Sequence, residues 1–437
     1  MTEEKIPACS FCGVAYSTDT PLIVGQEGHI CETCVLLAGQ VVDSWGRKRV
    51  VAKPLKNPLP PKGIKEKLDE FIISQDSAKE TLSVAVYNHY KRLVALGEHT
   101  NIDCDDGQVT IDKSNILLLG PSGTGKTLLA STLASIVGVP FVVADATTLT
   151  QAGYVGDDVE SIISRLLDAA EGNVELAEWG IVYIDEIDKL AHRSDSSHAT
   201  RDVSGEGVQQ ALLKMVEGTQ VKFSDKSGGN RDRTEEKTVD TRNILFIAGG
   251  AFSGLESVVE NRLKPARSGI GFHAPLGGSE QELPAQGIFT ETHADDLKHF
   301  GLIPEFIGRF PIIAGLEKLN EDALVQILSQ PKNALVKQYR QLFNYDEVEL
   351  EFTPGALRQI AIQALSRGTG ARGLRSIMES ILQKAMFEVP SKKSVNKCIV
   401  DEDVVTGAKS ILMLLKDGED KMEEKAGKSR AYAVNGS

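Results

Sequence analysis

The chain has 437 residues, of which 41% are hydrophobic and 25% are charged. This length predicts two to three domains, and the hydrophobic fraction is sufficient for one or more sizeable cores. With 48 basic and 61 acidic residues the net charge is −13, so most of the surface repels phosphate backbones, which argues against a dedicated nucleic-acid binder. No apolar run reaches the roughly 18 residues of a membrane span, and the acidic start lacks the apolar core of a secretory signal. We therefore expect a cytoplasmic protein without a membrane partner.

Shifts in composition divide the chain into five segments. We predict a small domain over residues 1–45, a linker over 46–63, a large domain over 64–313, a smaller domain over 314–415 and a tail without ordered structure over 416–437. The linker is rich in proline, which fixes φ and removes backbone donors, so we expect a semi-rigid spacer. The tail is rich in lysine, glutamate, glycine and serine, a composition typical of disorder.

The large domain alternates helical stretches with short runs of β-branched residues. Four such runs predict strands at Asn115–Leu119, Pro140–Ala144, Gly180–Ile184 and Asn243–Ala248. Strands that alternate with helices predict an α/β fold with a largely parallel sheet that is covered on both faces. Ser224–Thr241 and residues 273–286 have the composition of loops.

The smaller domain is expected to be mainly helical. Amphipathic periodicity predicts helices at Glu321–Phe343, Pro354–Ser366 and Gly373–Val389, with one or two short strands such as Val348–Phe352.

A glycine-rich segment follows the first predicted strand of the large domain. Gly120–Thr127 matches the pattern G-x₄-G-K-[ST], between the apolar Ile116–Leu119 and the helical Leu128–Val137. Its backbone N–H groups and the helix N-terminus can bind phosphate oxygens, while Lys126 reaches the β and γ phosphates and Thr127 binds Mg²⁺. The predicted nucleotide contacts are Gly120, Pro121, Ser122, Gly123, Thr124, Gly125, Lys126, Thr127 and Leu128.

Two carboxylates end a later buried strand, about 60 residues further along, in Ile181–Ile184 followed by Asp185 and Glu186. Phosphoryl transfer depends on positioning and charge stabilisation. We therefore expect Asp185 to position Mg²⁺ and Glu186 to orient and polarise the attacking water.

Four of the six cysteines form two close pairs near the start of the chain. Cys9 and Cys12 are separated from Cys31 and Cys34 by 18 residues, and each pair has two residues between its members. This spacing is typical of a tetrahedral site of four thiolates, which predicts structural zinc because no coordination position remains open. A domain as small as residues 1–45 would need the metal in order to fold.

The motifs together resemble the AAA+ ATPases and, within that superfamily, the unfoldases of the Clp proteases. The resemblance extends over nearly the whole chain, and it implies ATP as the nucleotide, a phosphate-loop core with a parallel sheet and a smaller helical C-terminal domain. It implies that Ile72 and Ile73 flank the adenine, although Ser74 precedes Gln75 where the family usually has glycine.

The same resemblance implies two arginines at the nucleotide. Arg309 would reach the γ-phosphate of the neighbouring subunit of a homohexamer, and Arg372 would come from the small domain of the same subunit. The strand that usually carries a further polar sensor ends in Gly249 and Gly250, so we assign no sensor there.

Three segments resemble the parts of Clp unfoldases that contact other proteins. Tyr154 and Val155, between two glycines, resemble the axial pore loop, and Arg201–Gly207 resembles the second pore loop. Ile270, Gly271 and Phe272 resemble the tripeptide that docks into apolar clefts of the ClpP peptidase. The basic pore-entrance cluster of relatives is replaced by a mixed stretch around Asn230, Arg231 and Asp232, which leaves the preferred substrates open. By the same resemblance the zinc module is a dimerising unit that receives substrates and adaptors.

Three functions are compatible with these motifs. The first is an ATP-driven unfoldase that delivers substrates to a separate peptidase, since the chain has no Ser, Thr or Cys nucleophile motif of its own. The second is a stand-alone chaperone that remodels protein complexes, and the third, against which the acidity counts, is an AAA+ nucleic-acid motor.

Overall fold

The computed structural model describes residues 8–17, 21–24, 28–35, 37, 58–97, 111–150, 157–191, 205–224, 236–263, 287–392, 394–415 and 431–432. Residues 1–53 and 54–437 form two compact units. The residues predicted to contact other proteins, namely Tyr154, Val155, Arg201, Ile270, Gly271 and Phe272, lie outside the described residues, as do Asn230, Arg231, Asp232 and the predicted loop 273–286.

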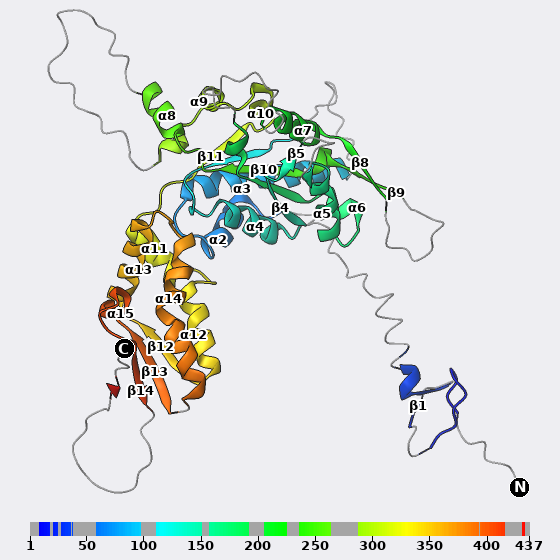
Figure 1. Ribbon diagram of the computed structural model, residues 1–437. Coiled ribbons are helices and arrows are strands. Elements are labelled where there is room, and N and C mark those ends of the chain that lie inside the picture. The colour runs from blue at the N-terminus through cyan, green and yellow to red at the C-terminus, as the bar shows by residue number, and fades with distance from the viewer. Residues whose placement is uncertain are drawn as a thin grey trace, which may run out of the picture. The chain divides into compact units, whose positions relative to one another are not determined.

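A five-stranded parallel sheet forms the centre of the large domain (Figure 1). In spatial order its strands are β11 (Ile312–Gly315), β3 (Ile116–Leu119), β10 (Leu245–Gly250), β7 (Ile181–Asp185) and β4 (Phe141–Asp145). Every neighbouring pair is parallel. The predicted α/β class and the predicted parallel sheet are confirmed.

Both faces of the sheet are buried. On one face Ile116, Tyr183 and Ile247 belong to a core that also includes side chains of three helices. The helices are α2 (Pro61–Asp69), α3 (Asp76–Gly97) and α4 (Lys126–Val137). The alternate residues Leu117 and Val182 are buried as well, so the strands are continuous apolar runs of the kind that parallel sheets require.

The remaining elements of the large domain follow the strands in chain order. They are β5 (Leu149–Thr150), β6 (Asp157–Asp158), α5 (Ser161–Ala169), α6 (Val174–Ala177), η1 (Ile187–Leu190), α7 (Glu206–Glu217), β8 (Gln220–Ser224), β9 (Glu236–Asp240), η2 (Thr241–Asn243), α8 (Leu255–Leu263), η3 (Ile288–Glu291), α9 (Ala294–Phe300) and α10 (Pro304–Gly308).

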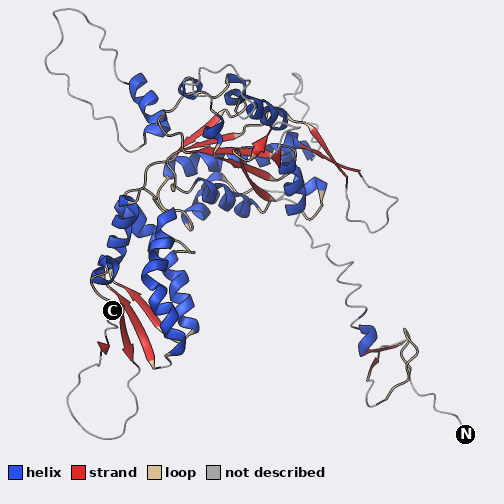
Figure 2. Ribbon diagram, in the orientation of Figure 1, coloured by secondary structure: helices blue, strands red, loops and turns tan. Residues whose placement is uncertain are grey.

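The C-terminal part has a hydrophobic core of its own. It contains α11 (Glu321–Ser329), α12 (Leu335–Tyr345), α13 (Pro354–Ser366), α14 (Arg372–Glu388), η4 (Val389–Ser391) and α15 (Glu402–Thr406), together with the strands β12 (Glu349–Phe352), β13 (Val395–Val400), β14 (Leu412–Leu415) and β15 (Ala431–Tyr432). Figure 2 shows the helices beside this second sheet. The described part of the N-terminal unit contains an antiparallel pair, β1 (Leu22–Val24) and β2 (His29–Cys31).

Several boundaries differ from the sequence-based expectations. The single helix expected over Glu321–Phe343 is two helices, since α11 ends at Ser329 and Pro331 cannot continue it. The loop expected over Ser224–Thr241 contains β9, which pairs antiparallel with β8.

The domain limits differ as well. The limit expected after residue 313 falls inside β11, a strand that we did not predict and that pairs with β3 up to Gly315. The linker expected up to residue 63 overlaps α2, in which Pro61 occupies the first turn, where its missing N–H costs nothing.

The second sheet is larger than the one or two strands that we expected. Within the tail expected to lack ordered structure, β15 pairs with β14.

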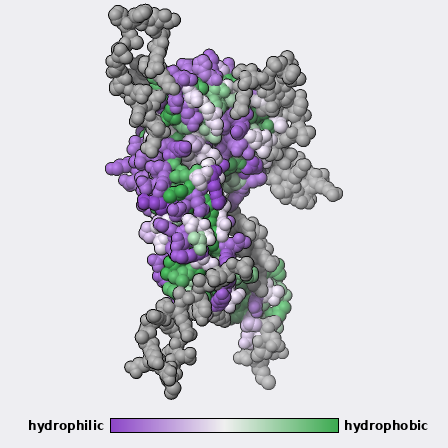
Figure 3. Space-filling model, turned by 60° about the vertical axis from the view of Figure 1, so that its left-hand side comes forward, coloured by the Kyte–Doolittle hydropathy of each residue, from purple (hydrophilic) through white to green (hydrophobic). Residues whose placement is uncertain are grey.

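The exposed surface is largely polar. On the face shown in Figure 3, hydrophilic side chains predominate and hydrophobic ones form small separate groups. Among the described helices, none combines the length and the apolarity that crossing a membrane requires.

Candidate nucleotide and zinc sites

The phosphate loop and the two carboxylates meet at the carboxyl edge of the parallel sheet. Strands β3 and β7 flank β10, and both run in the same direction. The chain leaves β3 into Gly120–Thr127, and it leaves β7 at Asp185 and Glu186. This edge of a parallel sheet is where ligands of α/β proteins bind.

Two glycines of the loop are required by close neighbours. A Cβ atom on Gly120 would lie 2.8 Å from the Cβ of Leu316, and one on Gly123 would lie 2.7 Å from the carbonyl oxygen of Thr369. Gly123 also has φ +81°, which side chains rarely adopt. The loop is therefore held tightly between the end of β11 and the start of α14.

Lys126 lies buried at the first position of α4. Its Nζ donates to the carbonyl oxygens of Gly120 at 2.6 Å and Pro121 at 3.0 Å. Burial lowers the pKa of Lys126 to about 8, and the nearby Asp185 opposes this shift. Phosphate oxygens at this point would provide the negative charge that the buried ammonium needs.

The site also provides oxygen ligands of the kind that Mg²⁺ prefers. Thr127 Oγ1 lies 3.1 Å from Asp185 Oδ2. The other carboxylate oxygen accepts from the Tyr183 hydroxyl at 3.2 Å and from the Glu186 backbone N–H at 3.0 Å. Asp185 is thus fixed at its strand end, whereas Glu186 is exposed and adopts the left-handed conformation with φ 56°.

The residues predicted to flank adenine lie between α2 and α3. Ile72 is buried and Ile73 is half-buried. The Lys79 ammonium donates to the Ile72 carbonyl oxygen at 2.7 Å and to Asp69 Oδ1 at 2.7 Å. This buried lysine fixes the backbone of the segment, and it was not predicted.

The small domain contacts the phosphate loop directly. Arg372 at the start of α14 donates to the Ser122 hydroxyl at 3.2 Å, and the Ala371 N–H donates to the Gly123 carbonyl oxygen at 3.4 Å. Two predicted site residues that are 250 positions apart in the chain are thereby brought together.

Arg309 is held elsewhere. It follows α10, and its guanidinium pairs with Glu217 at the end of α7, with Nη2 at 2.6 Å and Nε at 2.9 Å from Oε1. Within the described part of the chain, no hydrogen bond joins Arg309 to the phosphate loop or to Asp185 of the same chain.

Several polar residues around the site were missed at the sequence level. A Cβ atom on Gly249 would lie 2.2 Å from the Tyr183 hydroxyl, so this hydroxyl occupies the space that a polar side chain at the end of β10 would need. Gln75 and Gln209 are buried amides that join distant segments. Their only sequence signal is their type, because their partners lie far away in the chain.

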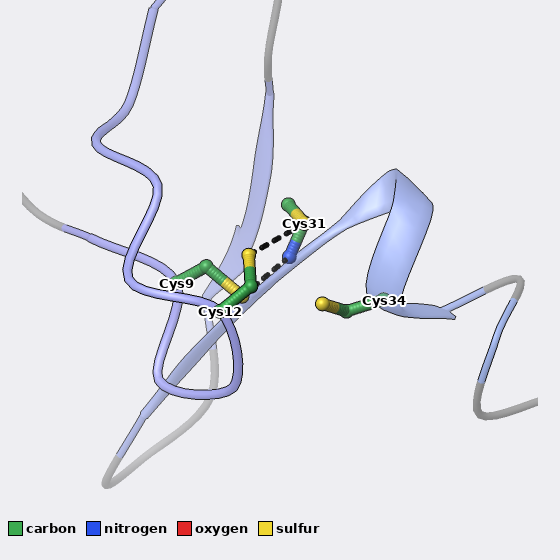
Figure 4. A group of neighbouring side chains, drawn as sticks. All are labelled: Cys9, Cys12, Cys31 and Cys34. Carbon is green, nitrogen blue, oxygen red and sulfur yellow. Dashed lines mark hydrogen bonds between the residues drawn. The ribbon is translucent and has the colours of Figure 1, made fainter.

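The four predicted cysteines of the N-terminal unit converge (Figure 4). Their sulfur atoms all lie within 4.8 Å of one another. The backbone N–H of Cys31 donates to the Cys9 sulfur at 3.3 Å. Hydrogen bonds led by that of the Cys12 backbone N–H lower the pKa of Cys9 to about 6, whereas neighbouring thiols, Cys12 foremost, raise the pKa of Cys34 to about 12. Four sulfurs that compete for protons at this distance fit a Zn²⁺ ion, which replaces those protons.

The sheet order, the phosphate loop with its paired acidic residues and the helical domain that contacts the loop define an ATPase of the AAA+ class. Three known families match the chain. Residues 111–313 match the AAA domain (Cdc48 subfamily), residues 319–401 match the C-terminal, D2-small domain of ClpB protein, and residues 7–44 match the ClpX C4-type zinc finger.

Two relatives extend the similarity to almost the full length. The ATP-dependent Clp protease ATP-binding subunit ClpX 3 of Methylococcus capsulatus is 57% identical over 436 residues, which cover 98% of each chain. The ATP-dependent Clp protease ATP-binding subunit ClpX of Azotobacter vinelandii is 56% identical over 428 residues, which cover 96% of this chain and 95% of the relative. The chain belongs to the ClpX family, and its cofactors are ATP, Mg²⁺ and Zn²⁺.

Proposed function

We propose that the protein is an ATP-dependent unfoldase and translocase that works as a homohexamer. The observation that carries the proposal is the position of the two arginines. Arg372 bonds to the phosphate loop of its own chain, whereas Arg309 is paired with Glu217. An arginine that completes the site of another subunit requires an oligomer, and arginines supplied in this way stabilise the transition-state charge of phosphoryl transfer.

Each residue of the site then has one task. Lys126 and Arg372 bind phosphate, and Thr127 and Asp185 hold the oxygen ligands of Mg²⁺. Glu186 orients the water and takes its proton as the bond to the γ-phosphorus forms. Arg309 of the neighbouring subunit stabilises the charge on the transferring group.

The coupling to polypeptide is proposed from the sequence. Tyr154 and Val155 grip the substrate chain in the axial pore, with Arg201 on the second pore loop, and Ile270–Phe272 docks on the ClpP peptidase. The names of the two relatives, which are ATP-binding subunits of a Clp protease, support this partner. The exposed Phe11 and Val24 of the zinc module are suited to dimerisation and to binding substrates or adaptors.

The first test is steady-state ATP hydrolysis with added unstructured polypeptide or added DNA. We expect polypeptide to stimulate turnover and DNA to have no effect. Stimulation by DNA alone would overturn the proposal in favour of a nucleic-acid motor.

A second test separates delivery to a peptidase from stand-alone remodelling. Phe272→Ala should abolish degradation in the presence of ClpP while ATP turnover stays unchanged. Degradation that continues at the normal rate would contradict the docking assignment.

A further inference from the structure

A buried glutamine on α7 joins the acidic segment to the arginine segment of the same chain. Gln209 is fully buried. Its Nε2 donates to the carbonyl oxygen of Leu190 at 2.7 Å, and its Oε1 accepts from the N–H of Ile303 at 3.0 Å. The orientation of the amide is unambiguous, because one partner can only accept and the other can only donate.

Each partner belongs to a segment with a task in hydrolysis. Leu190 ends η1, the single turn that begins directly after Glu186. Ile303 is the N-cap of α10, which ends at Gly308 immediately before Arg309. One side chain therefore fixes the backbone on both sides of the catalytic arrangement.

A second contact joins the same helix to the arginine. Glu217, the last residue of α7, holds the Arg309 guanidinium, and α10 itself packs against α7. Helix α7 thus sets both the start of α10, through Gln209, and the side chain that follows α10, through Glu217. Because a helix moves as a rigid body, a shift of α7 changes the place of Arg309.

We propose that Gln209 is a positioning residue for the trans-acting arginine. It aligns α10, and hence Arg309, with the Asp185–Glu186 segment of its own subunit, so that the arginine reaches the neighbouring site at the correct height. This proposal rests on the proposed function, because it requires Arg309 to act on another subunit.

The test uses single polypeptides in which a wild-type subunit alternates with a variant subunit. The variant subunit carries Glu186→Gln, so it binds nucleotide without hydrolysing it but still supplies its arginine. All turnover then comes from wild-type subunits, and it reports the arginine of their neighbours. Adding Gln209→Met to the variant subunit removes both hydrogen bonds in a side chain of similar size.

We expect Gln209→Met in the silent subunit to lower the turnover of the wild-type subunits by roughly tenfold, as displacements of about 1 Å do in catalytic arrangements. The matched control is Gln210→Met, since the neighbouring Gln210 is exposed and bonds only to Glu206 among the contacts described. It should leave turnover unchanged. Turnover with Gln209→Met that equals the control would overturn the proposal.

Two further variants separate the possible failures. Arg309→Ala in the silent subunit must lower the turnover of its neighbours, and if it does not, the proposed function fails independently of Gln209. Ile303→Pro removes the same hydrogen bond from the other side, because the φ of −71° at Ile303 suits proline and the N–H is lost. Nucleotide binding by the silent subunit shows that each variant is folded. Full turnover with a folded Ile303→Pro variant would also contradict the proposal.

Discussion

A lysine ammonium that is buried among carbonyl oxygens keeps its proton only while the surrounding charges favour it. Lys126 is in this position, and burial lowers its pKa to about 8. Bound phosphates raise the pKa again, because an opposite charge stabilises the protonated form. The affinity for nucleotide and the protonation of Lys126 are therefore linked.

We predict that nucleotide affinity decreases as the pH rises above about 8. The free protein loses the Lys126 proton there, whereas the complex retains it, so binding must take up a proton, and affinity should fall by up to about tenfold per pH unit. Calorimetry in buffers of different ionisation enthalpy measures this uptake directly.

Lys113 provides the control for this prediction. Burial lowers its pKa to about 7, but it bonds to the carbonyl oxygens of Thr241 and Ile244, not to the phosphate loop. Lys113→Met should leave the proton uptake intact. Uptake that disappears with Lys113, or an affinity independent of pH between 8 and 10, would contradict the role given to Lys126.

A second prediction at the residue scale concerns Ser74, which has φ 57° at a position where the family usually has glycine. The left-handed conformation is unfavourable for a residue with a Cβ atom. Ser74→Gly should therefore raise the free energy of unfolding by about 0.5–1 kcal/mol, after the extra chain entropy of glycine is subtracted. Urea unfolding measures the change. Ser131→Gly, inside α4, should have the opposite sign, and a loss of stability with Ser74→Gly would refute the argument.

At the scale of elements, one amide fixes the chain where it passes from β11 towards α11. Gln75 is buried, and its side chain exchanges two hydrogen bonds with the backbone of Glu317, at 2.9 Å to the carbonyl oxygen and 2.8 Å from the N–H. Gln75 directly follows the predicted adenine segment. The junction between the two domains is thus tied to the nucleotide site.

We predict that Gln75→Leu lowers the free energy of unfolding by about 1–3 kcal/mol, since it leaves a backbone donor and an acceptor unpaired. The comparison is Gln363→Leu, which removes one hydrogen bond to Val405 from a half-buried side chain and should cost less. The two midpoints of urea unfolding decide, and equal losses would contradict the special role of Gln75.

The comparison of sequence and structure is also clearest at this scale. The phosphate loop and Asp185 could be predicted because each motif is contiguous and each neighbouring strand is fully apolar. Strand β9 could not, because Glu236–Asp240 is polar and pairs only through its backbone with β8. Strand β11 is short and ends in glycine, so it gives almost no periodic signal.

The same limit explains which parts of the site were missed. Gln75 and Gln209 act through partners 242 and 94 positions away, and no local pattern indicates such pairs. The break between α11 and α12 was visible in principle, because Pro331 lies inside the helix that we expected. The amphipathic pattern on both sides concealed it.

At the scale of the whole molecule, the zinc module and the ATPase are separate units of the chain. A module of this size folds only with its metal, whereas the ATPase part has large cores of its own.

We predict that a zinc-selective chelator, with Mg²⁺ in excess, removes zinc without changing basal ATP hydrolysis by more than about twofold, since the metal stabilises only the fold that it holds together. Released zinc and phosphate are measured in the same sample. Cys9→Ser should reproduce the effect of the chelator, and Cys398→Ser, a buried thiol of the small domain, should release no zinc. Loss of basal hydrolysis on chelation would show that the module supports the ATPase.

The contact between the phosphate loop and the start of α14 has a mechanical consequence. Arg372 and Ala371 touch the loop from the small domain, so pulling that domain away removes contacts next to the nucleotide. By thermodynamic reciprocity, the work that the nucleotide can do on the angle between the domains equals the change in its affinity when that angle is forced. A substrate that resists unfolding would thus transmit its load to the ATP site, and the dissociation rate of the nucleotide would depend on how firmly that substrate is folded.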